Sequence, residues 1–316
     1  DGNKDHPGYT PTDDYNYALT AQCMDFLGIS EHNHFSSPDN PGNIISNYHS
    51  GLNEAKAFTT AHPSFLALYG MEWGVISGGG HVVVYGNEMN NLFGWESGSG
   101  EWGPTNNYDV YVAKSDYTGA NGLFKTINDY AANNTFGTLA HPNPTDFNNL
   151  ANVAYNVVAD NAITGVAVES GPATATNTTY SNPGSPMSYV WYYQTLLAKG
   201  YHLGPTVDHD NHNTTFGKTT YSRTAVVAPS LSEASIIDAV RNMHYYATED
   251  CDSKIDFRIN SQIMGSLFTD RYAPVISVSL TDGTTSTSNA IIRLMYGQPG
   301  SGVLAVKLDS VIGNSM

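Results

Sequence analysis

Short apolar runs alternate with longer segments of helical spacing over the first three-quarters of the chain. Runs such as FLALYGME and ITGVAVES have the length and the continuous apolar character of buried strands. Repeated strand–helix units predict an α/β domain built on a parallel sheet, open or closed into a barrel. The expected strands are 24–30, 65–72, 81–87, 136–141, 163–170 and 201–208, and the expected helices are 14–23, 44–61, 123–132, 189–199 and 232–243.

The pattern changes near Lys254. Four apolar runs, KIDFRIN, PVISVSL, AIIRLMY and VLAVKL, follow one another without helical segments between them and are separated by turn-rich stretches. This pattern predicts a small C-terminal antiparallel β module of sandwich type, complete or cut short. We therefore divide the chain into residues 1–252, the α/β part, and residues 253–316, the β module.

The amino-acid composition limits the classes of molecule that the protein is expected to bind. The 316 residues carry a formal net charge of −16 and contain no Lys/Arg block, which argues against binding to nucleic acid. An acidic protein of this kind can bind an anionic substrate when bound metal ions reverse the local field. No apolar run has membrane-spanning length. The polar surface comes mostly from Asn, Ser, Thr, Gly and Tyr, which favours a secreted or cell-surface protein whose signal peptide lies outside this sequence.

Two cysteines, Cys23 and Cys251, are too few for a disulfide framework. A single bridge between them requires an oxidising compartment, and the alternative is a pair of independent, half-buried thiols. The sequence leaves both alternatives open.

Residue types that bind metals recur where the expected strands end. In a parallel barrel these ends form one rim, so the side chains are expected to meet there. A single His at a strand end is usually structural, but five such ends with His, Asp or Glu favour a polynuclear metal site. His81 opens its strand but lies close in sequence to Glu72. The rim residues are Glu31, His32, Glu72, His141, Glu169 and the cluster from Asp208 to His212.

The stretch GPTVDHDNHNTTFG concentrates two carboxylates and two imidazoles between glycines. An Asp and a His two residues apart in an irregular loop can both reach one pocket, and together they suit Zn, Mn or Fe. We expect Asp210 and His212 to bind metal directly, while Asp208 and His209 support them from outside the metal's ligand shell.

These residues resemble a known family. The order ISEHN, GME…GHVVVYGN, LAHP and DHDNH is similar to that of the PHP (polymerase and histidinol phosphatase) metallohydrolases, and more narrowly to their CehA/McbA-like branch. The resemblance covers about residues 1–250 and continues weakly into the β module. It implies a distorted seven-stranded (β/α) barrel with two or three divalent transition metals, which hydrolyses phosphate esters or, in this branch, carbamate-type bonds.

The resemblance also implies roles for single residues. Glu72 matches the family's bridging carboxylate. Glu31 stands where the family usually has Asp, and we expect it to support the ligands from the outer shell. With Asp210 and His212, Glu72 is expected to carry catalysis. The ligands that the resemblance implies are Asp1, His32, Glu72, His81, His141, Asp210 and His212.

The family's opening H-x-H motif is absent, because the sequence begins at Asp1, after the place where the motif would stand. We expect a longer chain that contains the motif and its strand. The alternative is a degenerate member of the family whose metals stabilise a secreted structural or binding protein.

Other candidates have weaker support. Arg223 is expected to contact an anionic substrate because cations are scarce, with a structural ion pair as the alternative. His34 is a candidate substrate contact or an exposed loop residue. Glu169 is a candidate outer-shell acceptor.

The sequence therefore predicts a metal-dependent phosphoesterase that acts on a small anionic ester through water activated between two ions about 3.5–4 Å apart. A carbamate or ester hydrolase is the alternative activity. Self-association is expected, if at all, through strand edges of the β module.

Overall fold

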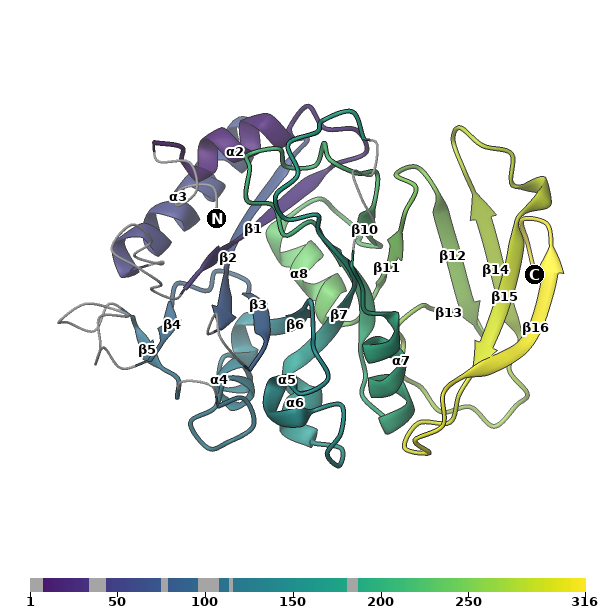
Figure 1. Cartoon of the computed structure of the whole chain (residues 1–316). Coiled ribbons are helices and arrows are strands. Elements are labelled where there is room, and N and C mark those ends of the chain that lie inside the picture. Colours follow the sequence, from purple (N-terminus) through teal and green to yellow (C-terminus); the bar gives the residue numbers. More distant parts are fainter. Residues whose placement is uncertain (1–7, 34–43, 75–78, 96–107, 114–115, 181–186) are drawn as a thin grey trace.

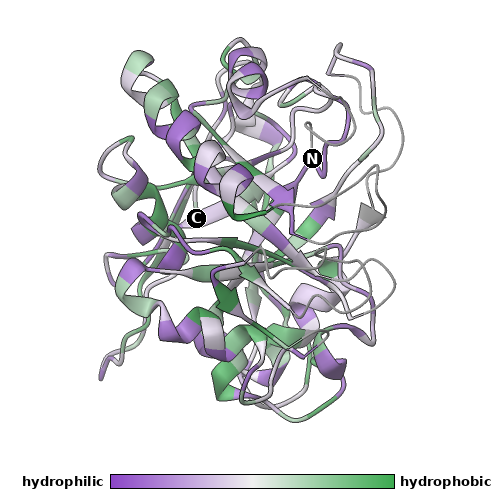
Figure 2. Ribbon diagram, turned by 90° about the vertical axis from the view of Figure 1, so that its left-hand side faces the viewer, coloured by the Kyte–Doolittle hydropathy of each residue, from purple (hydrophilic) through white to green (hydrophobic). Residues whose placement is uncertain are grey.

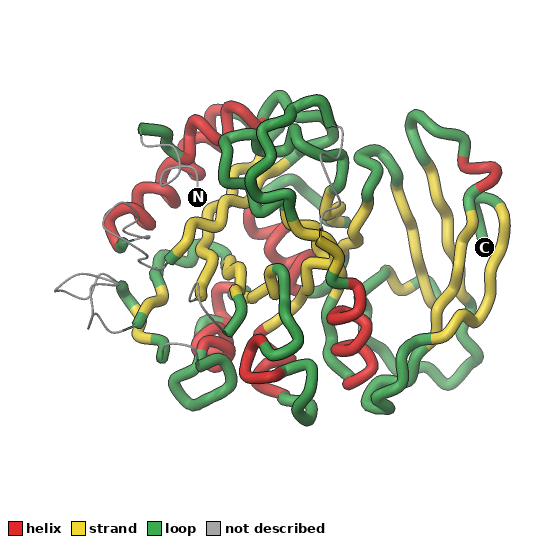
Figure 3. The backbone as a smooth tube through the Cα atoms, in the orientation of Figure 1, coloured by secondary structure: helices red, strands yellow, loops and turns green. Residues whose placement is uncertain are grey.

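A mixed sheet forms the centre of the α/β part of the chain (Figures 1 and 3). The computed structural model describes residues 8–33, 44–74, 79–95, 108–113, 116–180 and 187–316. The sheet has seven strands in the order β1-β2-β3-β6-β7-β8, and β9 pairs with β7. Its strands are β1 (Phe26–His32), β2 (Leu66–Gly74), β3 (His81–Tyr85), β6 (Phe136–Ala140), β7 (Ile163–Ser170), β8 (Met187–Ser188) and β9 (Gly204–Asp208).

The sheet is not wholly parallel as the sequence predicted, because β3 runs antiparallel to both of its neighbours. Only residues 75–80 separate β2 from β3. A parallel connection needs a dozen or more residues, so a segment of this length can only turn the chain back. As a result, the start of β3 lies beside the ends of β2 and β6: His81 pairs with Gly74 on one side and with Ala140 on the other.

The sheet is not a closed seven-stranded barrel, and this corrects the expectation from the sequence. Six strands, β1-β2-β3-β6-β7-β9, follow one another in a curled half-barrel (Figure 1). Among the described residues, no ladder joins β9 to β1. A closed barrel leaves no strand edge unpaired, whereas here β1 has β2 as its only partner within the described chain.

Helices cover the sheet, and most lie where the sequence predicted them (Figure 3). The long helix α3 packs against β2, and Ser232 caps α8 by accepting a hydrogen bond from the Ser235 backbone N–H. No helix among the described residues is long and apolar enough to span a bilayer. The helices are α2 (Pro11–Ala18), α3 (Ile45–Ala61), α4 (Leu123–Asp129), α5 (Asp146–Asn149), α6 (Val157–Ala162), α7 (Val190–Lys199) and α8 (Glu233–Arg241).

Aromatic side chains dominate the core. Trp73 on β2 is fully buried, and its ring makes T-shaped contacts with those of Trp95 and Tyr117 at centroid distances of 5.6 and 5.3 Å. The apolar strands gather in the interior of the ribbon in Figure 2. A second, smaller cluster joins Leu66 and Leu68 of β2 to Ile236 of α8. The core therefore fixes the inner strands firmly, and the site lies at their ends.

The C-terminal strands form separate small sheets (Figure 1). One has the order β13-β12-β14 and another pairs β15 with β16, while β10 pairs with β11 beside the main sheet. No hydrophobic side chain between Tyr246 and Met316 is among the buried ones, so these sheets do not enclose the core of a sandwich. Their bounds are β10 (Arg223–Val226), β11 (Tyr245–Thr248), β12 (Lys254–Ile259), β13 (Gln262–Ile263), β14 (Ile276–Thr281), β15 (Ile291–Tyr296) and β16 (Val306–Ile312).

We expect a chain that ends after Asp252 to keep its metal-binding capacity. The sheets beyond that residue contribute no side chain to the hydrophobic clusters of the α/β part, and Cys251 stays in place. Metal stoichiometry and thermal unfolding of the truncated chain test this prediction. If the truncated chain folds but binds no metal, the domain boundary at 252 is misplaced.

Candidate metal centre

The carboxylate of Glu72 is the centre of a histidine cluster. Its Oε1 accepts hydrogen bonds from Nδ1 of His81 at 2.8 Å and from Nε2 of His141 at 3.3 Å. Nε2 of His32 lies 3.0 Å from its Oε2. Three imidazoles from three different strand ends therefore converge on one buried carboxylate.

The sheet order explains this convergence. His32 ends β1, and its register partner in β2 is Glu72. Because β3 is antiparallel, His81 starts its strand at the same rim, next to the end of β6, where His141 follows. His141 has a backbone φ of +29°, a strained conformation for a residue with a side chain. Such strain is common at functional sites.

The cluster is strongly coupled electrostatically. Burial alone would raise the pKa of Glu72, but hydrogen bonds from His141, His32 and His81 outweigh burial and hold the pKa well below its usual value. Burial lowers the pKa of His141, yet the hydrogen bond to Glu72 and that residue's charge raise it to about 9. His141 is therefore protonated near pH 7 when no metal is bound, and its positive charge faces the ionised carboxylate of Glu72.

The Asp208–His212 loop reaches the same place. The rings of His32 and His212 are 5.4 Å apart between centroids. Nδ1 of His212 donates to the backbone oxygen of Asp210 at 2.8 Å and lies 3.7 Å from its carboxylate Oδ1. Asp210 has a φ of +50°, so a second strained residue lies at this rim. One cavity of about 850 Å³ is lined by His32, Glu72, His141, Asp208, Asp210 and His212.

Several polar atoms in this cavity lack partners. Oδ2 of Asp208 is buried without a hydrogen bond, and burial raises the pKa of this carboxyl to about 7. The hydroxyls of Ser170 and Thr206 also lie on this wall, and that of Ser170 is buried without a hydrogen-bond partner. The sequence reasoning did not single out these two residues. The signal was present, because Thr206 precedes Asp208 by two residues on one strand and so shares its face.

The donor set fits divalent transition metals. One oxygen of Glu72 and one nitrogen each of His81 and His141 lie within 4.8 Å of one another. A mixture of imidazole and carboxylate ligands suits Zn, Mn or Fe. The unpartnered oxygen of Asp208 lies on the wall of the same cavity, where it can support the ligands from outside the metal's ligand shell. These residues can hold more than one ion.

Not every predicted site residue is found in the cluster. Asp1 and His34 lie outside the described residues. Within the described chain, Glu31 makes no hydrogen bond or ion pair with the cluster, and strand alternation turns its side chain away from that of His32. Glu169 is buried and does not line the cavity. The supporting roles expected for Glu31 and Glu169 are therefore not apparent in the geometry.

His209 is partly buried beside its neighbours in the loop, and its Nε2 lies 2.9 Å from the backbone oxygen of Ser222. Burial lowers the pKa of this imidazole to about 4, so it is neutral near pH 7. A neutral ring with one nitrogen donating to a carbonyl fixes the loop that carries Asp208 and Asp210.

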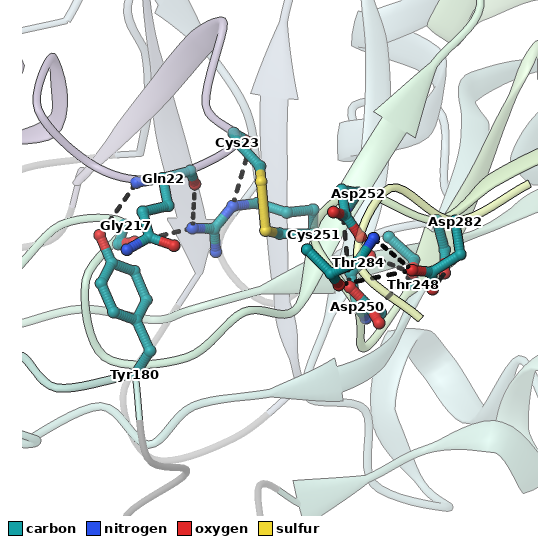
Figure 4. The surroundings of a disulfide bond; sticks show 12 residues. Gln22, Cys23, Tyr180, Gly217, Thr248, Asp250, Cys251, Asp252, Asp282 and Thr284 are labelled. Carbon is teal, nitrogen blue, oxygen red and sulfur yellow. Dashed lines mark hydrogen bonds between the residues drawn. A yellow bond between two sulfur atoms is a disulfide. The ribbon is translucent and has the colours of Figure 1, made fainter. Parts of the chain in front are cut away.

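Arg223 does not act as the predicted substrate contact. Its Nε donates to the backbone oxygen of Cys23, and its Nη1 and Nη2 atoms donate to four more carbonyls. A guanidinium has five N–H donors, and all five are used here, so none remains for an anion. The side chain instead connects the segment before β1 to the loop before β10. Figure 4 shows its partners Gln22, Cys23 and Gly217 beside the disulfide.

We expect Arg223→Lys to destabilise the fold by about 2–4 kcal/mol, because an ammonium with three donors leaves buried carbonyls without partners. The Michaelis constant of the folded variant should stay unchanged. Denaturant unfolding and steady-state kinetics measure the two effects. A raised Michaelis constant at unchanged stability would restore the substrate-binding role.

A series of loop variants separates direct ligands from supporting residues. Asp210→Asn and His212→Ala should each remove metal and activity together, because each deletes a ligand. Asp208→Asn should cost about 10- to 100-fold if it acts from the outer shell. His209→Ala should keep metal and mainly lower stability. Metal content and hydrolysis rate are measured for all four, and a dominant loss in His209→Ala would contradict this assignment.

Comparison with known proteins gives limited information. No protein-family model matches the chain, and no curated protein matches it. Among solved structures it is similar to a two-domain protein from Bacteroides vulgatus that contains a predicted PHP-like metal-dependent phosphoesterase. The identity is 12%, the TM-score is 0.45, and the alignment covers 96% of this chain and 80% of that one. A likeness this distant does not decide function, so the proposal below is based on the site.

Proposed function

We propose that the protein is a metal-dependent hydrolase, and specifically a phosphoesterase. The observation that carries the proposal is the convergence of His32, His81 and His141 on the buried carboxylate of Glu72. A purely structural cluster would not need three separate strand ends to deliver imidazoles to one carboxylate, and it would not be open to a cavity.

The ligand positions support binding of two or three divalent ions, Zn, Mn or Fe. Glu72 would hold ions with His81 and His141 on one side and with His32 on the other, while Asp210 and His212 approach from the facing loop. When bound, such ions acidify water and neutralise charge that develops on a phosphoryl group.

The protein's own groups have distinct roles around the substrate. Glu72 stays ionised and fixes the orientation of the histidines. The strained backbone at His141 and Asp210 fixes the direction of these two side chains before substrate arrives. Asp208 offers a carboxylate oxygen without a hydrogen bond in the same cavity, where it can accept a proton. The neutral ring of His209 fixes the loop from behind.

The charges of the protein favour an anionic ester as substrate, with its negative charge neutralised by metal ions bound at the site. The chain has a net charge of −16, and Arg223 in the cavity wall has no free donor. Neutralisation of a bound phosphate would therefore depend on metal ions rather than on Arg223. The resemblance of the sequence to PHP hydrolases supports the same substrate class.

Carbamate and carboxylic ester hydrolysis is the second candidate, and one observation favours it. Much of the cavity wall is apolar, with Phe26, Leu68, Phe136 and Ile237 among the lining residues. An uncharged organic ester would find more contact there than a free phosphate.

The test compares p-nitrophenyl phosphate, bis(p-nitrophenyl) phosphate and p-nitrophenyl acetate after reconstitution with Zn or Mn. We expect metal-dependent turnover of a phosphate ester that disappears with chelator. Turnover of the acetate alone would favour the second candidate. Metal binding without turnover of any ester would instead support a binding or structural protein.

We also propose that the protein works outside the reducing cytosol. Cys23 and Cys251 form a disulfide in the structure, which corresponds to the first of the two alternatives that the sequence left open. Disulfides persist mainly in oxidising compartments. The composition of the polar surface supports the same location.

A further inference from the structure

Two of the clustered histidines lie where their strands give way to irregular chain. His81 is the first residue of β3 and follows Gly80, and His141 comes directly after β6, which ends at Ala140. The rings of the two histidines are 5.1 Å apart between centroids. The contacts of the irregular segments beside them therefore affect the direction of both imidazoles.

The segment after His141 contains three consecutive residues with a left-handed backbone. The φ angles of Phe147, Asn148 and Asn149 are +55°, +55° and +61°. Asn tolerates this conformation, but a bulky residue such as Phe adopts it rarely. Strain of this kind persists only where surrounding contacts impose it, and it collects at functional sites. The contacts that hold Phe147 in this conformation therefore indicate what the segment does.

Phe147 packs against the chain just before β3. The residue is fully buried, and its backbone N–H donates to the backbone oxygen of Gly79 at 2.7 Å. A Cβ atom placed on Gly80 would lie only 2.6 Å from the ring of Phe147, so only glycine permits this approach. Because Gly80 precedes His81, the contact fixes the chain where the imidazole begins.

A third segment joins this contact. The hydroxyl of Tyr117 donates to the backbone oxygen of Gly80, and its ring makes a T-shaped contact with that of Phe147 at 5.3 Å. Oδ1 of Asn148 accepts hydrogen bonds from the backbone N–H groups of Tyr117 and Thr118 at 2.9 and 3.3 Å. The segments around Gly80, Tyr117 and Phe147 therefore contact one another in all three pairings, and none can shift without the other two.

The connection from His141 to Phe147 is a closed turn. Oδ2 of Asp146 accepts a hydrogen bond from the backbone N–H of Asn143 at 2.7 Å, and the N–H of Asp146 donates to the backbone oxygen of Asn143 at 3.1 Å. Asp146 is also buried. A displacement of Phe147 would therefore be transmitted to His141.

We propose that Phe147 is a positioning residue of the metal centre. It packs on Gly80 on one side and anchors the turn after His141 on the other, which sets the spacing at which the imidazoles of His81 and His141 both reach Glu72. Phe147 does not line the cavity, so it acts through the histidines and not on the substrate. This inference rests on the proposed function, because the spacing matters for catalysis only if the imidazoles bind metal with Glu72.

The first test is made without metal. Diethyl pyrocarbonate modifies imidazoles, and mass spectrometry gives the rate at each histidine. Phe147→Leu should increase the rates at His81 and His141 by about threefold or more, because the smaller side chain loosens the segments on both sides. The rate at His32 should stay unchanged, since β1 carries this residue.

The matched control is Phe124→Leu. Phe124 on α4 is also fully buried, and its ring also contacts that of Tyr117, at 5.9 Å between centroids. The nearest atoms to a Cβ on Gly80, however, belong to Phe147 and Asp146. Both variants remove a buried ring and should lower the unfolding midpoint similarly, but the control should leave all three modification rates unchanged.

The second test measures zinc affinity by competition with a chromophoric chelator. Phe147→Leu should weaken binding about tenfold or more, as is typical when a residue that supports metal ligands is lost. Phe124→Leu should bind zinc as the unmodified chain does. Equal loss of affinity in both variants would mean that the effect comes from general loss of stability, and it would overturn the proposal.

Asn148→Gly is the second variant if Phe147→Leu does not fold. Glycine keeps the left-handed backbone, and the change removes the acceptor for the N–H groups of Tyr117 and Thr118. The same selective increase at His81 and His141 is expected.

The proposal fails if the rates at His81 and His141 do not change, or if Phe124→Leu increases them equally. The first test contains neither metal nor ester, so it decides this inference by itself. A chain that binds no metal at all would instead contradict the proposed function.

Discussion

Glu72→Gln is expected to abolish both metal binding and hydrolysis. The substitution keeps the size of the side chain but removes the negative charge on which His32, His81 and His141 converge. Loss of an outer-shell partner typically costs 10- to 100-fold in affinity, so loss of a shared ligand should cost more than about 100-fold. Elemental analysis after reconstitution, together with the rate on a phosphate ester, measures both effects.

The matched control is Glu88→Gln, which removes the same charge from an exposed carboxylate 3.9 Å from Lys56. This variant should keep full metal content and rate, because exposed ion pairs contribute little. If Glu72→Gln retains metal at the level of Glu88→Gln, Glu72 does not ligate it.

Removal of the disulfide is expected to cause the largest loss of stability. Cys23 and Cys251 are 228 residues apart in sequence, and their bridge connects the segment before β1 to the start of the C-terminal strands (Figure 4). A cross-link over so long a loop restricts the unfolded chain strongly, so the double variant Cys23→Ser/Cys251→Ser should lose about 3–5 kcal/mol. Denaturant unfolding measures this difference.

Reductant provides the control for this prediction. Dithiothreitol should lower the unfolding midpoint of the unmodified chain to that of the double serine variant and should leave the variant itself unchanged. If the unmodified chain and the double variant, each with and without dithiothreitol, all unfold at the same midpoint, the bridge does not form in solution.

The periodicity of the sequence was sufficient to locate most inner elements. Strand β7 has its predicted bounds, and α3 and α7 each differ by one residue at one end, because long apolar runs and helical spacing are local signals. The direction of β3 could not be read from its own residues. It follows from the length of the connection after β2, which also explains why His81 reaches the rim although it starts its strand.

The site could be predicted in part. Residue types at the ends of neighbouring strands predicted that His32, Glu72 and His141 lie close together, and the structure places them so. Their binding of metal stays a prediction. The role of Arg223 could not be predicted in this way, because its five partners are backbone carbonyls from distant segments. The open edge of β1 also depends on the assembled sheet rather than on any local pattern.

The most direct test of the metal centre is anomalous diffraction from crystals grown with Zn or Mn. The account predicts strong peaks within bonding distance of Glu72, His81 and His141, and of Asp210 or His212 for a further ion. A refined structure without a peak at Glu72, or with metal only at the acidic group of Asp250, Asp252 and Asp282, would contradict it.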